Sequence, residues 1–331
     1  MFFLLLYQKE IGKEEGSLIT NIPFERALVV GGAGFIGSNI VDFLLKRNIR
    51  VSVIDNLSSG RMSNIEHNLK NDKFNFYNLD IKNSIKSVYE SERPDIVFFL
   101  AAIPKVSYSV ENPTETDLVN INGLVNNLEQ ANKFCVSRFI FSSSSSVYGG
   151  SADLPTKESS PLSPQSPYAL QKMCGEHYCR LFSSVYGLDT VSLRYFNIFG
   201  PRQYGDSPYA SVISAFCNAI LKNTNPIIYG DGEQFRDFCY VDNVVYANLL
   251  SACHSNRLDG EVFNIGCGGR ISVNDLCSKM GLLDPSYKEE RAGDVKCSQA
   301  SILHAKKVFG YDIITDFDDG LKKTIDWYLS R

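Results

Sequence analysis

Tyr168 and Lys172 are the two residues whose types and spacing most directly suggest chemistry. They stand four positions apart in Tyr168-Ala-Leu-Gln-Lys172, so on a helix the phenol and the ammonium lie one above the other. A free tyrosine titrates near pH ~10 and is a poor base at neutral pH. A neighbouring ammonium favours the phenolate and lowers its pKa toward a useful range. The pair alone also fits an ordinary surface contact, so its meaning depends on the surrounding sequence.

A run of serines, Ser142–Ser146, precedes this pair and follows the apolar run 138–141. A serine hydroxyl at the end of a strand can lie between the tyrosine and a hydroxyl of a substrate. A serine turn followed by a Tyr-x-x-x-Lys pair is a specific combination when a nucleotide-binding turn stands upstream of both.

Such a turn is indicated by three glycines, Gly31, Gly34 and Gly37, which lie between a short apolar run and a segment of helical periodicity. Glycines allow a tight turn and a close approach of backbone N–H groups to a pyrophosphate, and the helix N-terminus favours the negative charge. Asp55 follows the next predicted strand, where a carboxylate accepts hydrogen bonds from both ribose hydroxyls and repels a 2′-phosphate. NAD is therefore favoured over NADP, and its oxidised nicotinamide is expected to favour the Tyr168 phenolate together with Lys172. Asp80, after the third strand, fits either an adenine contact or a turn cap.

Alternating strands and helices predict an α/β fold with a doubly wound parallel sheet (Rossmann) and right-handed crossovers. The predicted strands are 27–30, 51–54, 75–79, 95–100, 138–141 and 190–195, and the helices are 117–134 and 168–186. After residue 200 this alternation stops, and the sequence predicts a smaller discontinuous α/β substrate-binding lobe. Its predicted elements are a helix at 209–222, a helix at 242–255 capped by Asp242, a strand at 261–265, a helix capped by Ser272, and a helical tail at 303–331.

The predicted domains follow from this division. Residues 1–23 form an N-terminal extension, and 24–196 form an NAD-binding domain to which 242–266 return. Residues 197–241 and 267–331 form the second lobe.

From about residue 26 to 329, the chain resembles the extended short-chain dehydrogenase/reductases, and within them the UDP-hexose 4-epimerases. The resemblance is closest to UDP-N-acetylglucosamine 4-epimerases. The matching segments are GGAGFIG, IDNLSSG, SSSSSVYG, YALQK, LRYFNIFGPRQ, YGDGEQFRDFCYVDN and RAGDVKCSQA.

The resemblance implies a role for particular residues. The catalytic residues it implies are Ser144, Tyr168 and Lys172. The cofactor-binding residues are Gly31, Gly34, Phe35, Ile36, Gly37, Asp55, Asn56, Ser58, Gly60, Asp80, Ile81, Leu100, Ala101, Ala102, Tyr168, Lys172 and Tyr195, with Phe196 beside the nicotinamide. The substrate-binding residues are Ser144, Ser145, Tyr168, Asn197, Val212, Tyr229, Arg236, Arg291, Asp294 and Ser298.

The implied reaction is reversible oxidation at C4 of a UDP-hexose by NAD, through a 4-keto sugar that turns and takes the hydride back on its other face. In the resembling family the residue at position 298 lies beside C2 of the sugar. Serine leaves room there for an N-acetyl group, whereas tyrosine would clash. We therefore expect interconversion of UDP-GlcNAc and UDP-GalNAc, with UDP-Glc and UDP-Gal as further substrates. The segment 102–105 departs from the turn that many epimerases place beside the nicotinamide.

Related chemistries fit less well. Similar dehydratases carry an Asp-Glu pair where this chain has Ser145 and Ser146, and similar decarboxylases keep a glutamate at position 146. A UDP-glucuronate 4-epimerase needs a cation for the C6 carboxylate, and the sugar-facing segments show no surplus arginine. A non-catalytic NAD-binding scaffold or sensor is the remaining alternative, and such proteins commonly lose the tyrosine or the lysine.

The composition and charge of the chain limit the kinds of partner that it can bind. The 331 residues carry a net charge of −4, so no basic surface for nucleic acid is expected. The nine cysteines include no CxxC pair, which predicts reduced thiols, no metal site and a cytoplasmic location. The apolar start Met1–Tyr7 is too short for a targeting segment, and no apolar run reaches the length of a membrane span. By resemblance we expect a homodimer.

Overall fold

A seven-stranded parallel sheet forms the centre of the part of the chain that the structure, a computed structural model, describes: residues 22–150, 153–205, 210–290 and 296–331. The strand order is β11-β6-β5-β4-β1-β2-β3. Their bounds are β1 (Arg26–Val30), β2 (Arg50–Ile54), β3 (Phe74–Tyr77), β4 (Ile96–Phe99), β5 (Arg138–Ser144), β6 (Thr190–Tyr195) and β11 (Glu261–Ile265). The order reverses between β1 and β4, which confirms the predicted doubly wound α/β fold.

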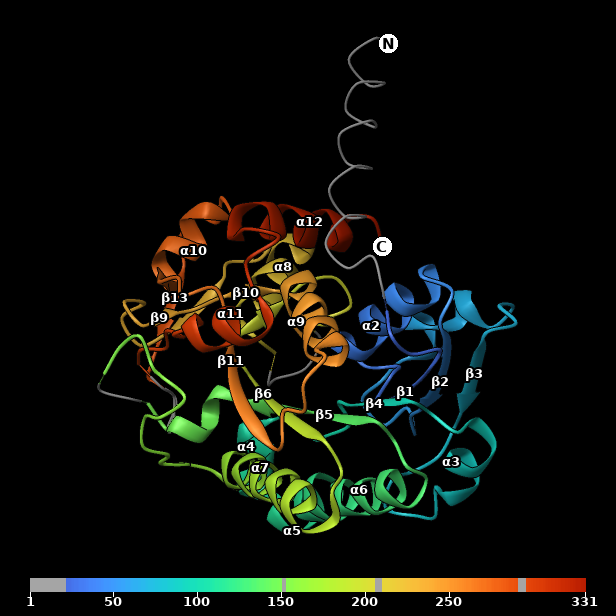
Figure 1. Ribbon diagram of the computed structural model, residues 1–331. Coiled ribbons are helices and arrows are strands. Elements are labelled where there is room, and N and C mark those ends of the chain that lie inside the picture. The colour runs from blue at the N-terminus through green and yellow to red at the C-terminus, as the bar shows by residue number, and fades with distance from the viewer. Residues whose placement is uncertain (1–21, 151–152, 206–209, 291–295) are drawn as a thin grey trace.

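Helices cover both faces of this sheet (Figure 1). Successive side chains of β1 point to opposite faces, so Leu28 and Val30 join one hydrophobic cluster while Ala27 and Val29 join the other. The first face carries α3 (Lys86–Glu92), α6 (Gly123–Lys133) and α7 (Pro167–Tyr186). The second carries α2 (Phe35–Lys46) and α9 (Val241–Cys253), which pack against each other.

Short elements complete this half of the molecule. Two of them, α4 (Val106–Glu111) and α5 (Pro113–Asp117), pack against α7. The 3₁₀ turns are Met62–Asn64, Glu66–Asn68 and Ser145–Tyr148.

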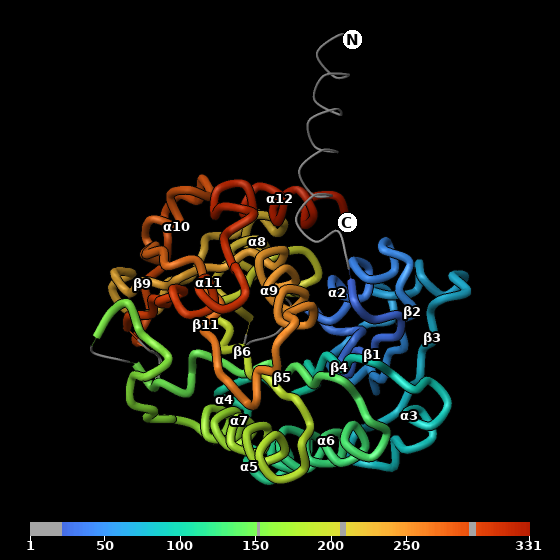
Figure 2. The backbone as a smooth tube through the Cα atoms, viewed as in Figure 1, coloured from blue at the N-terminus to red at the C-terminus, as the bar shows by residue number. Residues whose placement is uncertain are grey.

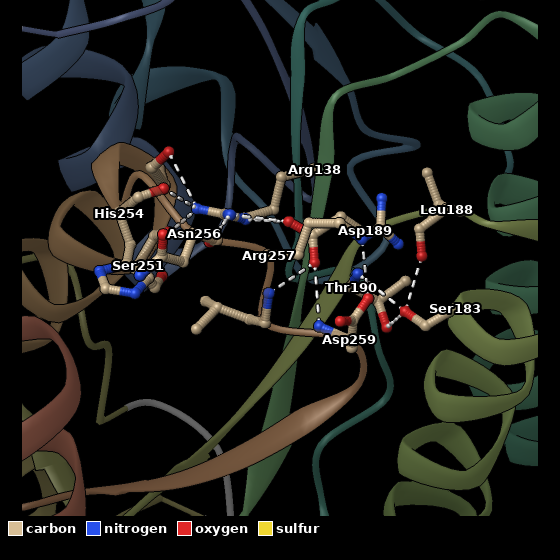
Figure 3. Close-up of polar contacts among 12 residues, drawn as sticks. Arg138, Ser183, Leu188, Asp189, Thr190, Ser251, His254, Asn256, Arg257 and Asp259 are labelled. Carbon is tan, nitrogen blue, oxygen red and sulfur yellow. Dashed lines mark hydrogen bonds and ion pairs between the residues drawn. The ribbon is translucent and has the colours of Figure 1, made fainter.

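A buried ion pair lies at the amino-terminal ends of β5 and β6 (Figure 3). Arg138, at the start of β5, contacts the Asp189 carboxylate at 2.7 Å and donates to the carbonyls of Ser251, His254 and Asn256. Asp189 also accepts from the backbone N–H groups of residues 258 and 259. Strands β5, β6 and β11 and the end of α9 are therefore held at one point.

The remaining elements form a second lobe beside α9 (Figure 2). Its helices are α8 (Val212–Lys222), α10 (Val273–Lys279), α11 (Leu303–Phe309) and α12 (Phe317–Leu329). Three two-stranded ladders join β7 (Ile198–Phe199) to β10 (Cys239–Tyr240), β8 (Ile227–Tyr229) to β13 (Ser286–Lys288), and β9 (Phe235–Arg236) to β12 (Ile271–Ser272). Phe199 packs edge-on against both Phe238 and Tyr240 at the base of this lobe.

Two helix predictions need correction. The segment predicted as one helix over 117–134 consists of α5, a π-helical turn at Leu118–Asn122, and α6. Asp242 does not cap α9, because the helix starts one residue earlier and Tyr240 occupies the capping position. Ser272 does cap α10, in a reciprocal capping box with Asp275.

Candidate active site

A cleft of about 1260 Å³ follows the carboxyl ends of the parallel strands and is closed on its far side by residues of the second lobe. Ligands of open α/β sheets bind at this edge, where the strand order reverses. The cleft brings together the glycine turn, the serine turn, the Tyr168–Lys172 pair, and the segments around Asn197, Arg236 and Ser298.

The backbone of the glycine turn runs so close to neighbouring backbone atoms that only glycine fits at Gly31 and Gly37. Gly31 has a φ of +84°, and a Cβ there would lie 2.6 Å from the backbone nitrogen of Ala101. At Gly37 a Cβ would lie 2.2 Å from the carbonyl oxygen of Gly31. Helix α2 starts at Phe35, before Gly37, and its capping residue, Gly34, has no side chain to bond to the first turn. The N–H groups of that turn therefore face the cleft as an anion site that fits a pyrophosphate.

Asp55 directly follows β2 and lies at the next position along the same cleft. Its carboxylate accepts hydrogen bonds from the backbone N–H groups of Ala33 (2.9 Å) and Leu57 (2.8 Å). Burial raises its pKa, and these two hydrogen bonds oppose that effect. A Cβ at Gly60 would lie 2.8 Å from both carboxylate oxygens, so the loop after β2 folds closely over Asp55. The cradle and the carboxylate together fit a dinucleotide such as NAD.

The other predicted cofactor residues also line the cleft. They are Phe35, Ile36, Asn56, Ser58, Asp80, Ile81, Leu100, Ala101, Ala102 and Tyr195, with Phe196 beside the last. The Asn56 side chain donates to Asp80 at 3.2 Å, and Asp80 caps its own turn by accepting from the N–H of Lys82. Both interpretations of Asp80 therefore remain compatible with its position.

Tyr168 and Lys172 lie in the first turns of α7, whose N-terminus is capped by Ser166 and has Pro167 at its first position. The Lys172 ammonium donates to the carbonyl oxygen of Ser142 at 2.6 Å and lies 5.8 Å from the centre of the Tyr168 ring. Ser144 is the last residue of β5, and its hydroxyl accepts from the hydroxyl of Ser146 at 3.0 Å. The cleft thus gathers the three predicted catalytic side chains.

Burial dominates the electrostatics of this pair. It raises the pKa of Tyr168 to about 12, although a hydrogen bond with Ser144 lowers it in part. It lowers the pKa of Lys172 to about 7. The prediction that Lys172 and an oxidised nicotinamide together favour the phenolate stays a prediction, because the second positive charge belongs to the cofactor. The phenolate needs further positive charge, which an oxidised nicotinamide carries.

A buried polar network lies behind the serine turn and was not predicted from the sequence. The Ser143 hydroxyl donates to Glu176 on α7. Arg194 on β6 binds the same carboxylate with two nitrogens, at 2.6 and 2.8 Å. Arg194 also donates to the Tyr148 hydroxyl, which in turn donates to Asn264. No local pattern signals these partners, because the five residues come from five separate elements.

Among the predicted substrate residues, Ser144, Ser145, Tyr168, Asn197, Arg236 and Ser298 line the cleft. Asn197 donates to the Ser298 hydroxyl at 3.2 Å, and Arg236 donates to the carbonyl of Lys296 at 3.1 Å. The described lining does not include Val212 or Tyr229: Val212 follows the lining residue Ser211, and Tyr229 ends β8. Arg291 and Asp294 fall outside the described residues.

Asp237 holds the sugar-side segments together. Its fully buried carboxylate accepts from the backbone N–H groups of Cys267 and Gly268 (2.9 Å each), Gly269 (3.3 Å) and Ala300 (2.9 Å). Burial raises its pKa, and the four hydrogen bonds oppose that effect. Arg236 directly precedes Asp237, and Ser298 lies two residues before Ala300, so both sit on one connected backbone unit.

No role is predicted from the sequence for the segment Arg202–Tyr204, although Arg202 and Gln203 end the matching segment LRYFNIFGPRQ. All three side chains line the cleft. Arg202 pairs with Asp42 on α2 at 2.5 Å, so this segment connects the second lobe with the first.

Comparison with known proteins places the chain among sugar-nucleotide enzymes. The sequence model of the NAD dependent epimerase/dehydratase family matches residues 27–266. A putative UDP-glucose 4-epimerase of Methanocaldococcus jannaschii is 38% identical over 307 residues, which are 91% of this chain and 97% of that protein. A UDP-glucuronate 4-epimerase of Thermodesulfobacterium geofontis is 33% identical, over 91% of this chain and 95% of that protein.

A solved structure is similar over almost the same span. It is a UDP-N-acetylglucosamine 4-epimerase from Methanobrevibacter ruminantium M1 in complex with UDP-N-acetylmuramic acid, 39% identical, with a TM-score of 0.87. The match covers 93% of this chain and 99% of that one.

Two features are absent from the residues that the structure describes. None of their helices is long and apolar enough to cross a membrane. Nor do those residues contain a group of three His, Cys, Asp or Glu side chains able to hold a metal ion.

Proposed function

The chain belongs to the NAD-dependent epimerase/dehydratase family of enzymes, and we propose that it is a UDP-hexose 4-epimerase that interconverts UDP-GlcNAc and UDP-GalNAc. The observation that carries the proposal is the position of Tyr168 in the cleft. Tyr168, Lys172 and Ser144 line the same cleft as the glycine cradle and Asp55, so a sugar hydroxyl at Tyr168 lies beside the nicotinamide end of a bound dinucleotide.

The proposed roles follow from the atoms present. The Tyr168 phenolate oxygen accepts the proton of the sugar 4-hydroxyl, and the Ser144 hydroxyl holds that oxygen in place. Lys172 is fixed by the Ser142 carbonyl, where its ammonium favours the phenolate once the site is filled. NAD, held by the glycine turn and Asp55, would supply the reversible hydride acceptor for C4. Binding energy from the nucleotide, away from C4, retains the 4-keto sugar while the hexose turns.

The choice of an N-acetylated hexose rests on Ser298. Its short side chain lines the cleft and is held by Asn197 at 3.2 Å, on the backbone unit that Asp237 anchors. A small residue at this point leaves space beside the sugar ring for a 2-acetamido group. The similarity to a UDP-N-acetylglucosamine 4-epimerase supports the same choice.

Two other hexoses remain as alternatives within the same reaction. UDP-Glc fits the same site without filling the space at Ser298. UDP-glucuronate needs a cation at C6, and most of the basic side chains in the described lining already have partners: Arg61 stacks on Tyr204, Lys172 bonds to Ser142, Arg202 to Asp42 and Arg236 to Lys296.

The test is an assay of the purified protein without added NAD, with UDP-GlcNAc, UDP-Glc and UDP-glucuronate in separate tubes, followed by NMR of the anomeric protons. We expect UDP-GalNAc to form faster than UDP-Gal. Conversion of UDP-Glc alone would retain the epimerase and reject the choice of sugar. With no conversion of any of the three, even after NAD is added, the epimerase proposal is wrong.

Two variants test the role of Tyr168. Tyr168→Phe removes its hydroxyl, and Tyr178→Phe, ten residues later on the same helix, is the matched control. Loss of one positioned proton acceptor lowers the rate by about 10²–10⁴-fold. The Tyr168→Phe variant is expected to lose conversion and keep bound NAD, whereas Tyr178→Phe keeps both.

We also propose that the protein is a homodimer that pairs through α7. This helix exposes Leu170, Leu181, Val185 and Tyr186, which are 46–62% exposed in the single chain. Sedimentation equilibrium of the wild type and of a Val185→Glu variant tests the pairing, and a monomeric wild type contradicts it.

A further inference from the structure

Tyr204 connects the two lobes at the loop that covers Asp55. It belongs to the segment after β7, yet its hydroxyl donates to the side-chain oxygen of Asn64 at 2.9 Å. The guanidinium carbon of Arg61 lies 3.5 Å from the centre of the Tyr204 ring. Both partners belong to the loop and 3₁₀ turn that follow β2.

The other ends of these contacts are in the cofactor cradle. Asn64 is buried and donates to the carbonyl oxygen of Ala33 at 2.8 Å, and the Arg61 N–H donates to the same oxygen at 3.0 Å. The N–H of Ala33 bonds to Asp55. Tyr204 therefore reaches the residues that hold a dinucleotide through one intermediate side chain, and Tyr204 itself lines the cleft.

Tyr204 is in turn fixed by its own lobe. The preceding carbonyl, of Gln203, accepts hydrogen bonds from the Tyr328 hydroxyl on α12 and from the Ser214 hydroxyl on α8. The Gln203 side chain bonds to Ser211 and Ser214 at the start of α8. The Trp327 ring packs edge-on against Tyr204, with ring centres 5.5 Å apart. A ring held this firmly acts as an anchor for the loop opposite it.

From this geometry we infer that Tyr204 is a positioning residue for the cofactor: it holds the loop Asn56–Asn64 closed over the adenosine half of the NAD site and so slows the release of NAD. An epimerase reduces and reoxidises its NAD within one turnover, so slow release keeps the enzyme active without free NAD. The inference rests on NAD binding and not on the identity of the sugar.

The experiment measures NAD release from the purified holoenzyme with no sugar present. The protein is diluted into a coupled dehydrogenase that consumes free NAD, and the rate gives the dissociation rate constant. Tyr204→Phe removes the hydrogen bond to Asn64 and keeps the ring, so we expect release roughly fivefold faster. Tyr204→Ala also removes the stack with Arg61, so we expect roughly 20-fold.

Tyr287→Phe is the matched control, because the Tyr287 hydroxyl also donates to an asparagine oxygen, that of Asn274 at 3.2 Å, outside the described cleft lining. It is expected to release NAD at the wild-type rate. Pairing Arg61→Ala with Tyr204→Ala is expected to give less than the sum of the two single effects, since both remove one contact.

The outcomes are decisive in either direction. Wild-type release from Tyr204→Phe, or equal acceleration in Tyr287→Phe, overturns the inference, as does a change in KM for the sugar nucleotide with NAD release unaltered. If Tyr204→Ala does not fold, the Phe variant and the Arg61→Ala variant still decide it. Because no sugar is present, failure here leaves the proposed epimerase activity untouched.

Discussion

The Ser143 hydroxyl donates a hydrogen bond to Glu176, which ties the serine turn to the helix that carries Tyr168 and Lys172. Glu176 lies one helical turn after Lys172 and is 4% exposed. Arg194 occupies its other lone pairs, so the carboxylate is paired and hydrogen-bonded. Ser144, the neighbour of Ser143, thus receives its position from a residue outside its own strand.

Glu176→Gln is expected to destabilise the protein by about 3–5 kcal/mol, because it leaves the buried Arg194 without a counter-charge. Urea unfolding measures this loss. Asp318→Asn is the control, since its ion pair with Lys279 is exposed and contributes less than about 1 kcal/mol. Equal effects of the two substitutions would contradict the importance of the buried network.

Lys172 gives a prediction for pH dependence. Its pKa falls to about 7 in the folded protein, so between pH 7 and its unfolded value the unfolded chain binds more protons, and this group makes folding more favourable as the pH rises. Lys172→Met removes that contribution. The melting temperature of the variant relative to wild type, both without NAD, should therefore be higher at about pH 7 than at about pH 9. A difference that is constant across this range would show that Lys172 keeps an ordinary pKa.

Ser298→Tyr is expected to lower kcat/KM for UDP-GlcNAc by roughly 100-fold and to leave UDP-Glc within about threefold, because a large ring fills the space beside C2. Ser298→Ala keeps the space and removes the hydrogen bond from Asn197, so it separates size from bonding. NMR of both reactions gives the ratio. Equal losses with the two sugars in the Tyr variant would remove Ser298 as a specificity residue.

Gly37→Ala is expected to weaken NAD binding by at least about tenfold, since its Cβ would lie 2.2 Å from the Gly31 carbonyl oxygen and the cradle must move. Calorimetric titration of NAD into stripped protein measures the affinity. Gly269→Ala is the control, because a Cβ there meets no atom within 4 Å. If both variants bind NAD like wild type, the cradle does not depend on the absence of a side chain.

The strands, the glycine turn and the Tyr168–Lys172 pair were predictable because each is encoded within a few consecutive residues. The same holds for the capping box at Ser272. The prediction that Asp242 caps α9 was wrong because aspartate is common both at the cap and in the first turn of a helix. The π-helical turn at Leu118–Asn122 has no signal in an otherwise helical pattern.

Contacts between distant segments could not be predicted in this way. The ion pair between Arg138 and Asp189 and the hydrogen bond between Tyr204 and Asn64 form only when the fold brings their elements together. The raised pKa of Tyr168 belongs to the same class, because it depends on how much protein surrounds the ring and not on its neighbours in sequence.

The four N–H groups gathered by Asp237 also bear on how such an enzyme changes during evolution. Ala300, two residues after Ser298, is held by a carboxylate from another segment, so the path of the chain there does not depend on the side chain at position 298. A substitution at position 298, the residue proposed to face the sugar, therefore leaves the hydrogen bond to Ala300 in place. Under the proposed role of Ser298, a single substitution there changes the preferred sugar while this anchor keeps the loop folded.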